Sequence, residues 1–261
     1  MNKIKTYINS YFTIKNSTND FWVHSEIDKC DLIISINEIK SFKKNVTKIL
    51  WLYEPKSIIP ETYKIVENCS IEYEIIACHL EDFHSINKSI KIEPYLPSWI
   101  DESDRIIYNK TKNLSMIAST KIMCKEHEYR QEVASQVHQK CDLYGFGREK
   151  EIKAKVDGLR DYRFSIAMEN CCADTYFTEK ILDCFLTGTV PIYWGTRKIC
   201  NIFNENGIVF LDYFLENIDS FDYEKEYKNR YKAIEENFEI AKEKNYSEAQ
   251  GVNSIIKNII K

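Results

Sequence analysis

FSIAMENCCADTYFTEKILDCFLTGTVPIYWG, residues 164–195, is the stretch that decides the fold we expect for this chain. It runs from a short apolar segment through a polar loop and a compact amphipathic helix to a second apolar segment that ends in glycine. This order is typical of a βαβ unit in a parallel sheet. Because ligands bind at the carboxyl ends of such strands, we expect a site in the loop before the helix.

The first turn of that helix contains the residues that we expect to bind a ligand. Thr178 is placed as an N-cap, so Glu179 and Lys180 fall in the first turn, and Gly188 is placed to end the helix. A lysine beside free backbone N–H groups suits a phosphate, and a glutamate there can accept hydrogen bonds from a ribose or a base. The residues alone equally allow a capped surface helix with a solvated Glu–Lys pair.

A family resemblance favours the first interpretation. MEN at 168–170, followed by YFTEKILDCFLTGTVPIYWG at 176–195, resembles the donor-binding signature of the α1,3/1,4-fucosyltransferases, glycosyltransferase family ten. That family carries F-E-N, then Y-[VI]-T-E-K, then G-T-[VI]-P-[VI] and a closing glycine. Order and spacing are kept over about thirty positions, which is more specific than an isolated glycine motif. The resemblance implies an α/β fold of the GT-B type, with two Rossmann-like domains facing a cleft.

Short apolar runs predict how the chain is divided. With 261 residues, 44% of them hydrophobic, it can form two small α/β domains. We expect an acceptor-side domain over 1–105, a nucleotide-sugar domain over 106–225, and a helical tail over 226–261 that packs across both, with the linker within 101–113. The runs that predict strands outside the opening stretch are KTYINSYF (5–12), DLIISI (31–36), KILWLY (48–53), YEIIAC (73–78), LSMIAST (114–120), CDLYGFG (141–147) and NIFNENGIVFLDYF (201–214).

A glutamate directly follows one of these strands. Glu54 comes after KILWLY and before Pro55, which restricts it to extended geometry at the carboxyl end of a strand. A solvated loop glutamate is the ordinary alternative. In the fucosyltransferases a strand that ends in glutamate, with proline soon after, carries the general base, so the resemblance implies this role for Glu54.

The resemblance also implies a donor site for GDP-fucose in the second domain. Arg130, in the helical segment 121–140, matches the family arginine that contacts the diphosphate, and a guanidinium can bind phosphate bidentately. Without the family, a surface arginine paired with a neighbouring glutamate would be expected. Tyr176 would contact the nucleotide and Glu179 the ribose. The full expected donor set is Arg130, Asn170, Tyr176, Thr178, Glu179 and Lys180.

Two further groups of residues remain open. His79 and Glu81, in CHLEDFHSI, are candidates for the acceptor side, for a rival base, or for an exposed turn. Cys124 and His127 have a ligand-like spacing but no second pair near them, so a thiol and a surface imidazole are expected rather than zinc. Nine cysteines without repeated CxxC spacing indicate reduced thiols.

Composition limits the partners and cofactors. A formal charge of -4 argues against a general nucleic-acid binder. The chain has no D-x-D motif, so we expect no essential metal and no cofactor, with Arg130 and Lys180 neutralising the diphosphate directly. The N-terminal residues are too often polar for a signal peptide or membrane span, which favours a cytoplasmic protein, peripheral to a membrane where the acceptor is lipid-linked.

These expectations combine into one function with two alternatives. The protein would be an inverting fucosyltransferase that moves L-fucose from GDP-fucose to a glycan hydroxyl, α1,3 or α1,4 on an N-acetylglucosamine- or glucose-type sugar. A transferase of the same fold could use another nucleotide sugar, because CCADT at 171–175 departs from the family loop. A non-catalytic glycan-binding relative is the other alternative. Neither acceptor, linkage nor oligomeric state follows from the sequence.

Overall fold

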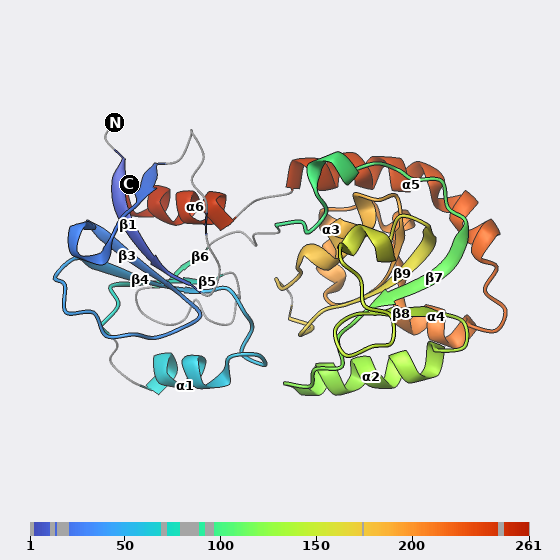
Figure 1. Cartoon of the computed structure of the whole chain (residues 1–261), viewed down its shortest axis with the longest axis horizontal. Coiled ribbons are helices and arrows are strands. Elements are labelled where there is room, and N and C mark those ends of the chain that lie inside the picture. Colours follow the sequence, from blue (N-terminus) through green and yellow to red (C-terminus); the bar gives the residue numbers. More distant parts are fainter. Residues whose placement is uncertain are drawn as a thin grey trace. The chain divides into compact units, whose positions relative to one another are not determined.

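The chain forms two compact units. The structure, a computed structural model, describes residues 3–10, 14, 21–68, 72–78, 89–91, 97–173, 175–244 and 248–260. Unit 1 comprises Met1–Tyr95 together with Ser247–Lys261, and unit 2 comprises Leu96–Tyr246. Each unit has its own parallel β-sheet with helices packed on it (Figure 1). This confirms the expected α/β class.

Unit 1 is built on a six-stranded sheet in the order β2-β1-β3-β4-β5-β6, and every pairing is parallel. In the central strands all of β3 and the last four residues of β4 are buried and mostly apolar, as in a sheet covered on both sides. The strands are β1 (Ile4–Asn9), β2 (Trp22–His24), β3 (Leu32–Ile36), β4 (Thr47–Leu52), β5 (Ile75–Cys78) and β6 (Ser89–Lys91).

Two α-helices cover opposite faces of this sheet, α1 (Pro60–Asn68) and α6 (Glu248–Ile260) (Figure 1). Helix α6 packs so closely that a Cβ on Gly251 would lie 2.9 Å from Cζ2 of Trp51. The last helix of the chain therefore completes the core that the first strands begin. A short 3₁₀ helix, η1 (Ile27–Lys29), precedes β3.

Unit 2 is built on a five-stranded parallel sheet in the order β11-β10-β9-β7-β8. The chain goes from β7 out to β8, then returns past β7 to β9. The sheet therefore has a topological switch point between β7 and β9, where doubly wound folds bind their ligands. The strands are β7 (Lys112–Ile117), β8 (Asp142–Tyr144), β9 (Tyr162–Met168), β10 (Val190–Trp194) and β11 (Val209–Phe210).

Helices cover both faces of this sheet as well. In Figure 1, α2 and α4 lie on one side of it, and α3 and α5 lie on the other. The helices are α2 (Lys125–Val137), α3 (Glu179–Phe185), α4 (Leu211–Asn217) and α5 (Tyr223–Lys244), with 3₁₀ turns η3 (Glu102–Asp104), η4 (Lys155–Gly158), η5 (Arg197–Asn201) and η6 (Glu205–Gly207). Two apolar clusters form the core of the unit, and α5 contributes side chains to both.

The unit boundaries differ from the expected ones. Unit 2 begins at Leu96 rather than 106. Ser98 already bonds to the buried carboxylate of Asp183, and Lys110, in the expected linker, is buried and donates to the carbonyl oxygens of Thr187 (2.7 Å) and Arg160 (3.0 Å). Polar sequence suggested a linker here because buried lysines paired with carbonyls leave no apolar signal.

The expected C-terminal tail is two elements in different units. Helix α5 stays in unit 2, where Ile234 is fully buried, whereas α6 belongs to unit 1. Of the strand expected over 201–214, only Val209–Phe210 pairs with the sheet, and α4 begins at Leu211. The strands expected in the other apolar runs are confirmed; β2 and β6, three residues each, were not foreseen.

Candidate active site

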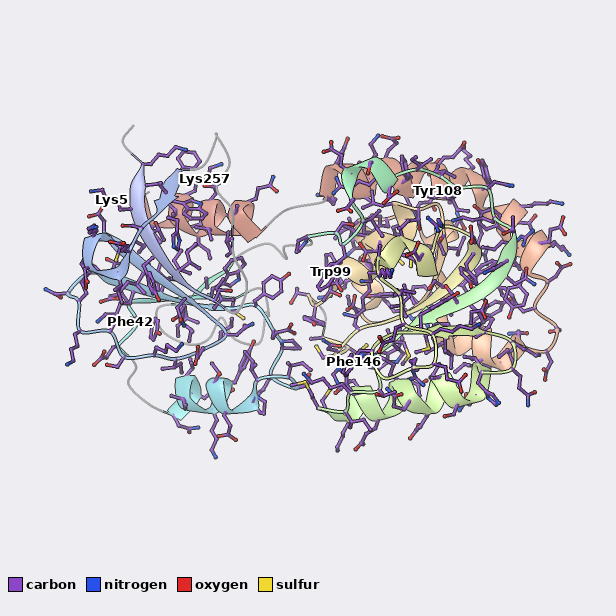
Figure 2. All side chains as sticks on the ribbon, viewed as in Figure 1. Lys5, Phe42, Trp99, Tyr108, Phe146 and Lys257 are labelled. Carbon is purple, nitrogen blue, oxygen red and sulfur yellow. The ribbon has the colours of Figure 1, made fainter. Side chains whose placement is uncertain are left out.

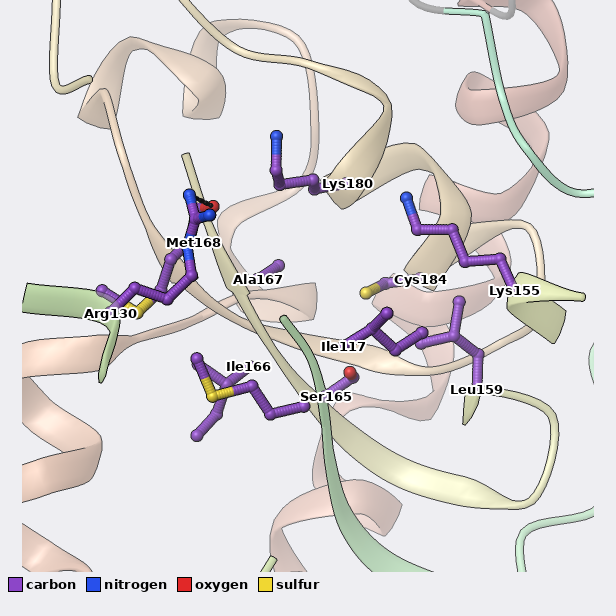
Figure 3. Close-up of a pocket in the computed structure, with 11 residues that line it drawn as sticks. Ile117, Arg130, Lys155, Leu159, Ser165, Ile166, Ala167, Met168, Lys180 and Cys184 are labelled. Carbon is purple, nitrogen blue, oxygen red and sulfur yellow. Dashed lines mark hydrogen bonds between the residues drawn. The ribbon is translucent and has the colours of Figure 1, made fainter. Parts of the chain in front are cut away.

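A pocket opens at the switch point of unit 2, below the carboxyl ends of β7 and β9 (Figure 3). Its volume of about 60 Å³ exceeds what a single water needs. Figure 3 shows Arg130 and Lys155 on opposite sides of the pocket, with Lys180 entering between them. The lining residues are Met116, Ile117, Arg130, Lys155, Leu159, Ser165, Ile166, Ala167, Met168, Lys180 and Cys184.

Arg130 lies within α2 and is only 8% exposed. Its Nη2 donates to the carbonyl oxygens of Met168 and Glu169, both at 3.1 Å, and to Oδ1 of Asn170 at 2.7 Å. Burial lowers its pKa, although a guanidinium stays charged at any working pH. Within the described ranges, the Arg130 side chain donates hydrogen bonds only through Nη2, so the end of β9 fixes the guanidinium and leaves its other edge for a ligand.

His127 is a buried part of the same cluster, so the prediction of a surface imidazole is wrong. Its Nδ1 accepts from the Met123 N–H at 3.2 Å, which leaves the proton on Nε2, 3.1 Å from Oδ1 of Asn170. Burial lowers the pKa of His127, and the charge of Arg130 acts in the same direction. A neutral imidazole therefore holds Asn170 in place from one side while Arg130 holds it from the other.

Glu169 is the central residue of the site, and the sequence reasoning missed it. Its side chain is fully buried. Oε1 accepts from the Thr178 N–H at 2.8 Å, and Oε2 accepts from Thr178 Oγ1 at 2.6 Å and from Lys180 Nζ at 3.2 Å. Lys180 Nζ also donates to Thr178 Oγ1 at 2.9 Å. Helix α3 begins after Thr178 as predicted, but the Thr178 hydroxyl bonds to Glu169 rather than capping the helix.

The closing glycine of the opening stretch has a packing role beside Glu169. A Cβ on Gly195 would lie 2.9 Å from Cγ of Glu169 and would collide with the hydroxyl of Tyr193. Tyr193 is buried, and burial, with the nearby Glu169 carboxylate, raises its pKa well above the usual value. Only glycine lets the chain pass this close to the buried carboxylate.

A second ionic cluster lies on the other side of Lys180. Lys155, from η4, pairs with Asp183 at 2.7 Å and with Glu179 at 3.3 Å. Burial alone would raise the pKa of Glu179, but the charges of Lys180 and Lys155 outweigh it and bring the pKa down to about 2. Burial raises the pKa of Asp183 despite the same lysine. Glu179 is thus a fixed, ionised carboxylate at the pocket rather than a solvated one.

The remaining donor candidate, Tyr176, is 2% exposed, and its N–H donates to the carbonyl oxygen of Ala173 at 3.0 Å. The structure thus brings Arg130, Asn170, Thr178, Glu179 and Lys180 into one connected set of contacts around the end of β9, and Tyr176 lies in the adjoining loop. Of the residues the sequence reasoning missed, only Glu169 had a signal, as the middle residue of MEN. Asp183 lies in the opening stretch but has only the pattern of a polar residue on an amphipathic helix, His127 was expected as a surface imidazole, and Lys155 lies in a segment without a motif.

Glu54 lies in unit 1, two residues after the end of β4, and is half-buried. Its position depends on Asn37, which follows β3. Oδ1 of Asn37 accepts from the N–H groups of Tyr53 (2.7 Å) and Glu54 (2.9 Å), and Asn37 itself has φ 61. A left-handed conformation is uncommon outside glycine, and asparagine tolerates it best. One strained residue therefore fixes the loop that presents Glu54.

The remaining expectations concern the acceptor side, a metal and a membrane span. His79 and Glu81 lie outside them. Within the described ranges, no three His, Cys, Asp or Glu side chains gather as metal ligands would. The same residues include no helix long and apolar enough to cross a membrane.

Solved structures define the class of the protein. A crystal structure of an α1,3-fucosyltransferase aligns with a TM-score of 0.55 at 16% identity, over 89% of this chain and 80% of that one. An Anabaena protein, HepE, in complex with UDP and glucose aligns with a TM-score of 0.52 at 8% identity, over 88% of this chain and 78% of that one. The molecule has the fold of the GT-B glycosyltransferases.

The family follows from sequence. The profile described as "Glycosyltransferase family 10 (fucosyltransferase) C-term" matches residues 107–252. The chain therefore belongs to glycosyltransferase family 10, the fucosyltransferases, which confirms the resemblance.

Two relatives match over short segments. An alpha-(1,3)-fucosyltransferase of Helicobacter pylori is 36% identical over 83 residues, 31% of this chain and 17% of the relative. A putative fucosyltransferase of Acanthamoeba polyphaga mimivirus is 29% identical over 70 residues, 27% of this chain and 12% of the relative. The match thus spans less than a fifth of either relative.

Proposed function

We propose that this protein transfers L-fucose from GDP-fucose to a hydroxyl of a glycan acceptor, with inversion at the anomeric carbon and formation of an α1,3 or α1,4 linkage. The observation that carries the proposal is the joint fixation of Arg130 and Lys180 by Glu169 at the switch point of unit 2. A solved α1,3-fucosyltransferase with GDP-fucose shares the fold, with a TM-score of 0.52 at 15% identity over 90% of this chain and 81% of that one.

The two cations would stabilise the departing GDP. Negative charge grows on the diphosphate as the glycosidic bond breaks, and preorganised cations in a partly buried site stabilise such charge strongly. Arg130 would bind phosphate oxygens with the guanidinium edge that faces away from β9. Lys180 has two of its three N–H donors on Glu169 and Thr178, which leaves the third for a phosphate. We propose that this arrangement makes a metal ion unnecessary for turnover.

The other side chains would orient the donor and activate the acceptor. Glu179, ionised and held by Lys155, would accept hydrogen bonds from the ribose hydroxyls. Glu54 would remove the proton of the acceptor hydroxyl as the new bond forms, a contribution of about 10²–10⁴ in rate. The fucosyl group then moves in a single displacement from phosphate oxygen to acceptor oxygen, and GDP leaves.

Calorimetric titration of the protein with GDP and with UDP, in the presence of chelator, tests the donor assignment. GDP should bind, and Lys180→Ala should weaken binding about 10- to 100-fold, the effect of a lost hydrogen bond to a charged group. Lys153→Ala, which removes an exposed lysine of the same unit, should leave binding unchanged. Preferential binding of UDP would support another nucleotide sugar, and binding of neither nucleotide would support the non-catalytic alternative.

Turnover tests the reaction itself. Release of GDP from GDP-fucose in the presence of a glycan panel should require an acceptor, and NMR of the product should show the inverted anomer. Metal-independent turnover is contradicted if chelated protein is inactive and a divalent ion restores the rate.

A further inference from the structure

Trp99 is an exposed aromatic side chain on a fixed backbone. It is 69% exposed and lies at the periphery of unit 2 (Figure 2). Its backbone N–H donates to Oδ1 of the buried Asp183 at 3.0 Å, and Ser98 Oγ donates to the same oxygen at 2.6 Å. The next residue, Ile100, is buried at 1% exposure. The protein therefore holds a large aromatic ring in solvent at a place that its backbone contacts define.

The Trp99 ring lies next to Lys155, which belongs to the ionic cluster at the pocket. Nζ of Lys155 lies 5.6 Å from the centre of the Trp99 ring and 3.3 Å from Oε1 of Glu179. Because the two distances share the lysine nitrogen, the ring centre is at most about 9 Å from the Glu179 carboxylate. Burial alone would lower the pKa of Lys155, but the Asp183 and Glu179 carboxylates outweigh it and raise the pKa. The lysine that links ring and carboxylate is thus charged and held on both sides.

The charged groups are ordered along the pocket. Figure 3 shows Arg130 at one side, Lys155 at the opposite side and Lys180 between them. A nucleoside diphosphate has the same order of chemistry, with phosphates at one end, ribose in the middle and base at the other end. With the phosphates at Arg130 and Lys180 and the ribose at Glu179, the base must lie beyond Glu179, on the side of Lys155. Trp99 is an exposed aromatic ring at that side.

We propose that Trp99 is the stacking platform for the nucleobase of the bound nucleotide. The inference rests on the proposed donor site and adds to it a base subsite. Aromatic stacking suits a purine because it uses the π-face of the base and needs no polar group on the protein. The neighbouring Lys155 would remain on its carboxylates, so base binding would break no ion pair.

Titrations with GDP and with inorganic pyrophosphate, followed by calorimetry and by tryptophan fluorescence, test the subsite. Trp99→Ala should weaken GDP binding about 5- to 100-fold and leave pyrophosphate binding unchanged, because pyrophosphate has no base to stack. Trp99→Phe should restore most of the GDP affinity. GDP should quench fluorescence more strongly in the wild type than in Trp99→Phe, because Trp22 and Trp51 are buried and Trp194, the fourth tryptophan, is partly buried and remains in both proteins.

Phe146→Ala is the matched control, because Phe146 is an 80% exposed aromatic of the same unit. It should bind GDP like the wild type. Equal GDP affinity in Trp99→Ala and the wild type overturns the subsite while the donor site stands. The subsite is also overturned if Trp99→Ala binds GDP normally but loses acceptor-dependent turnover. That result would place an acceptor sugar on the Trp99 ring. A wild type that binds neither GDP nor pyrophosphate overturns the proposed function and this inference together.

Discussion

The carboxyl edges of the two sheets are organised in opposite ways. In unit 2, ionised side chains fix one another, as Glu169 does with Lys180 and Lys155 does with Asp183. In unit 1, a side chain fixes backbone, because Asn37 holds the N–H groups of Tyr53 and Glu54. The difference shows two ways of placing a charge. A site for a charged ligand needs cations with buried counter-charges, whereas a single base needs only a loop of defined shape.

Loss of the Glu54 carboxylate should have the largest effect on turnover, and it should affect the site of unit 1 without affecting that of unit 2. Glu54→Gln keeps the shape but cannot take a proton, so acceptor-dependent turnover should fall about 10²- to 10⁴-fold. Calorimetric GDP binding should stay within twofold of the wild type, because we propose the donor site in unit 2. Glu61→Gln, at an exposed position of α1, is the control. Unchanged turnover in Glu54→Gln would show that the base is another residue.

Replacement of Glu169 should lower the stability of unit 2 and leave the stability of unit 1 unchanged. Glu169→Gln removes the charge that faces Lys180 and puts an amide N–H against one of its donors, which should lower the free energy of unfolding by about 1–3 kcal/mol. Urea unfolding monitored by circular dichroism measures the change, with the exposed Glu216→Gln as the control. The GDP affinity of Glu169→Gln should fall together with its stability. Wild-type stability and affinity would mean that Lys180 is fixed without this carboxylate.

Changes at Asn37 should give a smaller effect confined to unit 1. Asn37→Ala loses the acceptor for two N–H groups and adds strain at positive φ, so stability should fall by about 1–2 kcal/mol. Turnover should fall while GDP binding stays constant. Asn37→Asp keeps an acceptor oxygen and tolerates the same φ, so it should restore most of the turnover. Equal kinetics in Asn37→Ala and the wild type would remove this residue from the positioning of Glu54.

The smallest effect should be a pH dependence specific to unit 2. The folded pKa of Glu179, about 2, lies below its ordinary value of 4.5. Ionised Glu179 therefore stabilises the fold above about pH 4.5, and this contribution is lost as the pH falls toward 2. Urea midpoints of the wild type and Glu179→Gln should differ most at pH 7, and the difference should shrink as the pH falls from 4.5 toward 2. A difference that does not change with pH would show that Lys155 and Lys180 do not hold this carboxylate ionised.

The same contrast explains what could be predicted. The unit 2 motif lies within one βαβ element, so residues 164–195 predicted the strand, the helix that begins after Thr178, and the following strand. In unit 1 the candidate base came from a strand followed by Glu54 and Pro55, and its partner Asn37 is 17 positions away from Glu54. Local sequence patterns predict local geometry, but they do not predict which loops meet at the edge of a sheet.

The sequence by itself determined the class of the fold, most of the strands and the family, because apolar periodicity and a contiguous motif can be recognised from the order of residues alone. Only the tertiary structure decided that Glu169 is the buried counter-charge of Lys180, that Arg130 and His127 both hold Asn170, and that α6 returns to the sheet of unit 1. The physical reason is burial. A charge is stable inside a protein only beside its partners, and the partners come from whichever strands and helices the topology brings together.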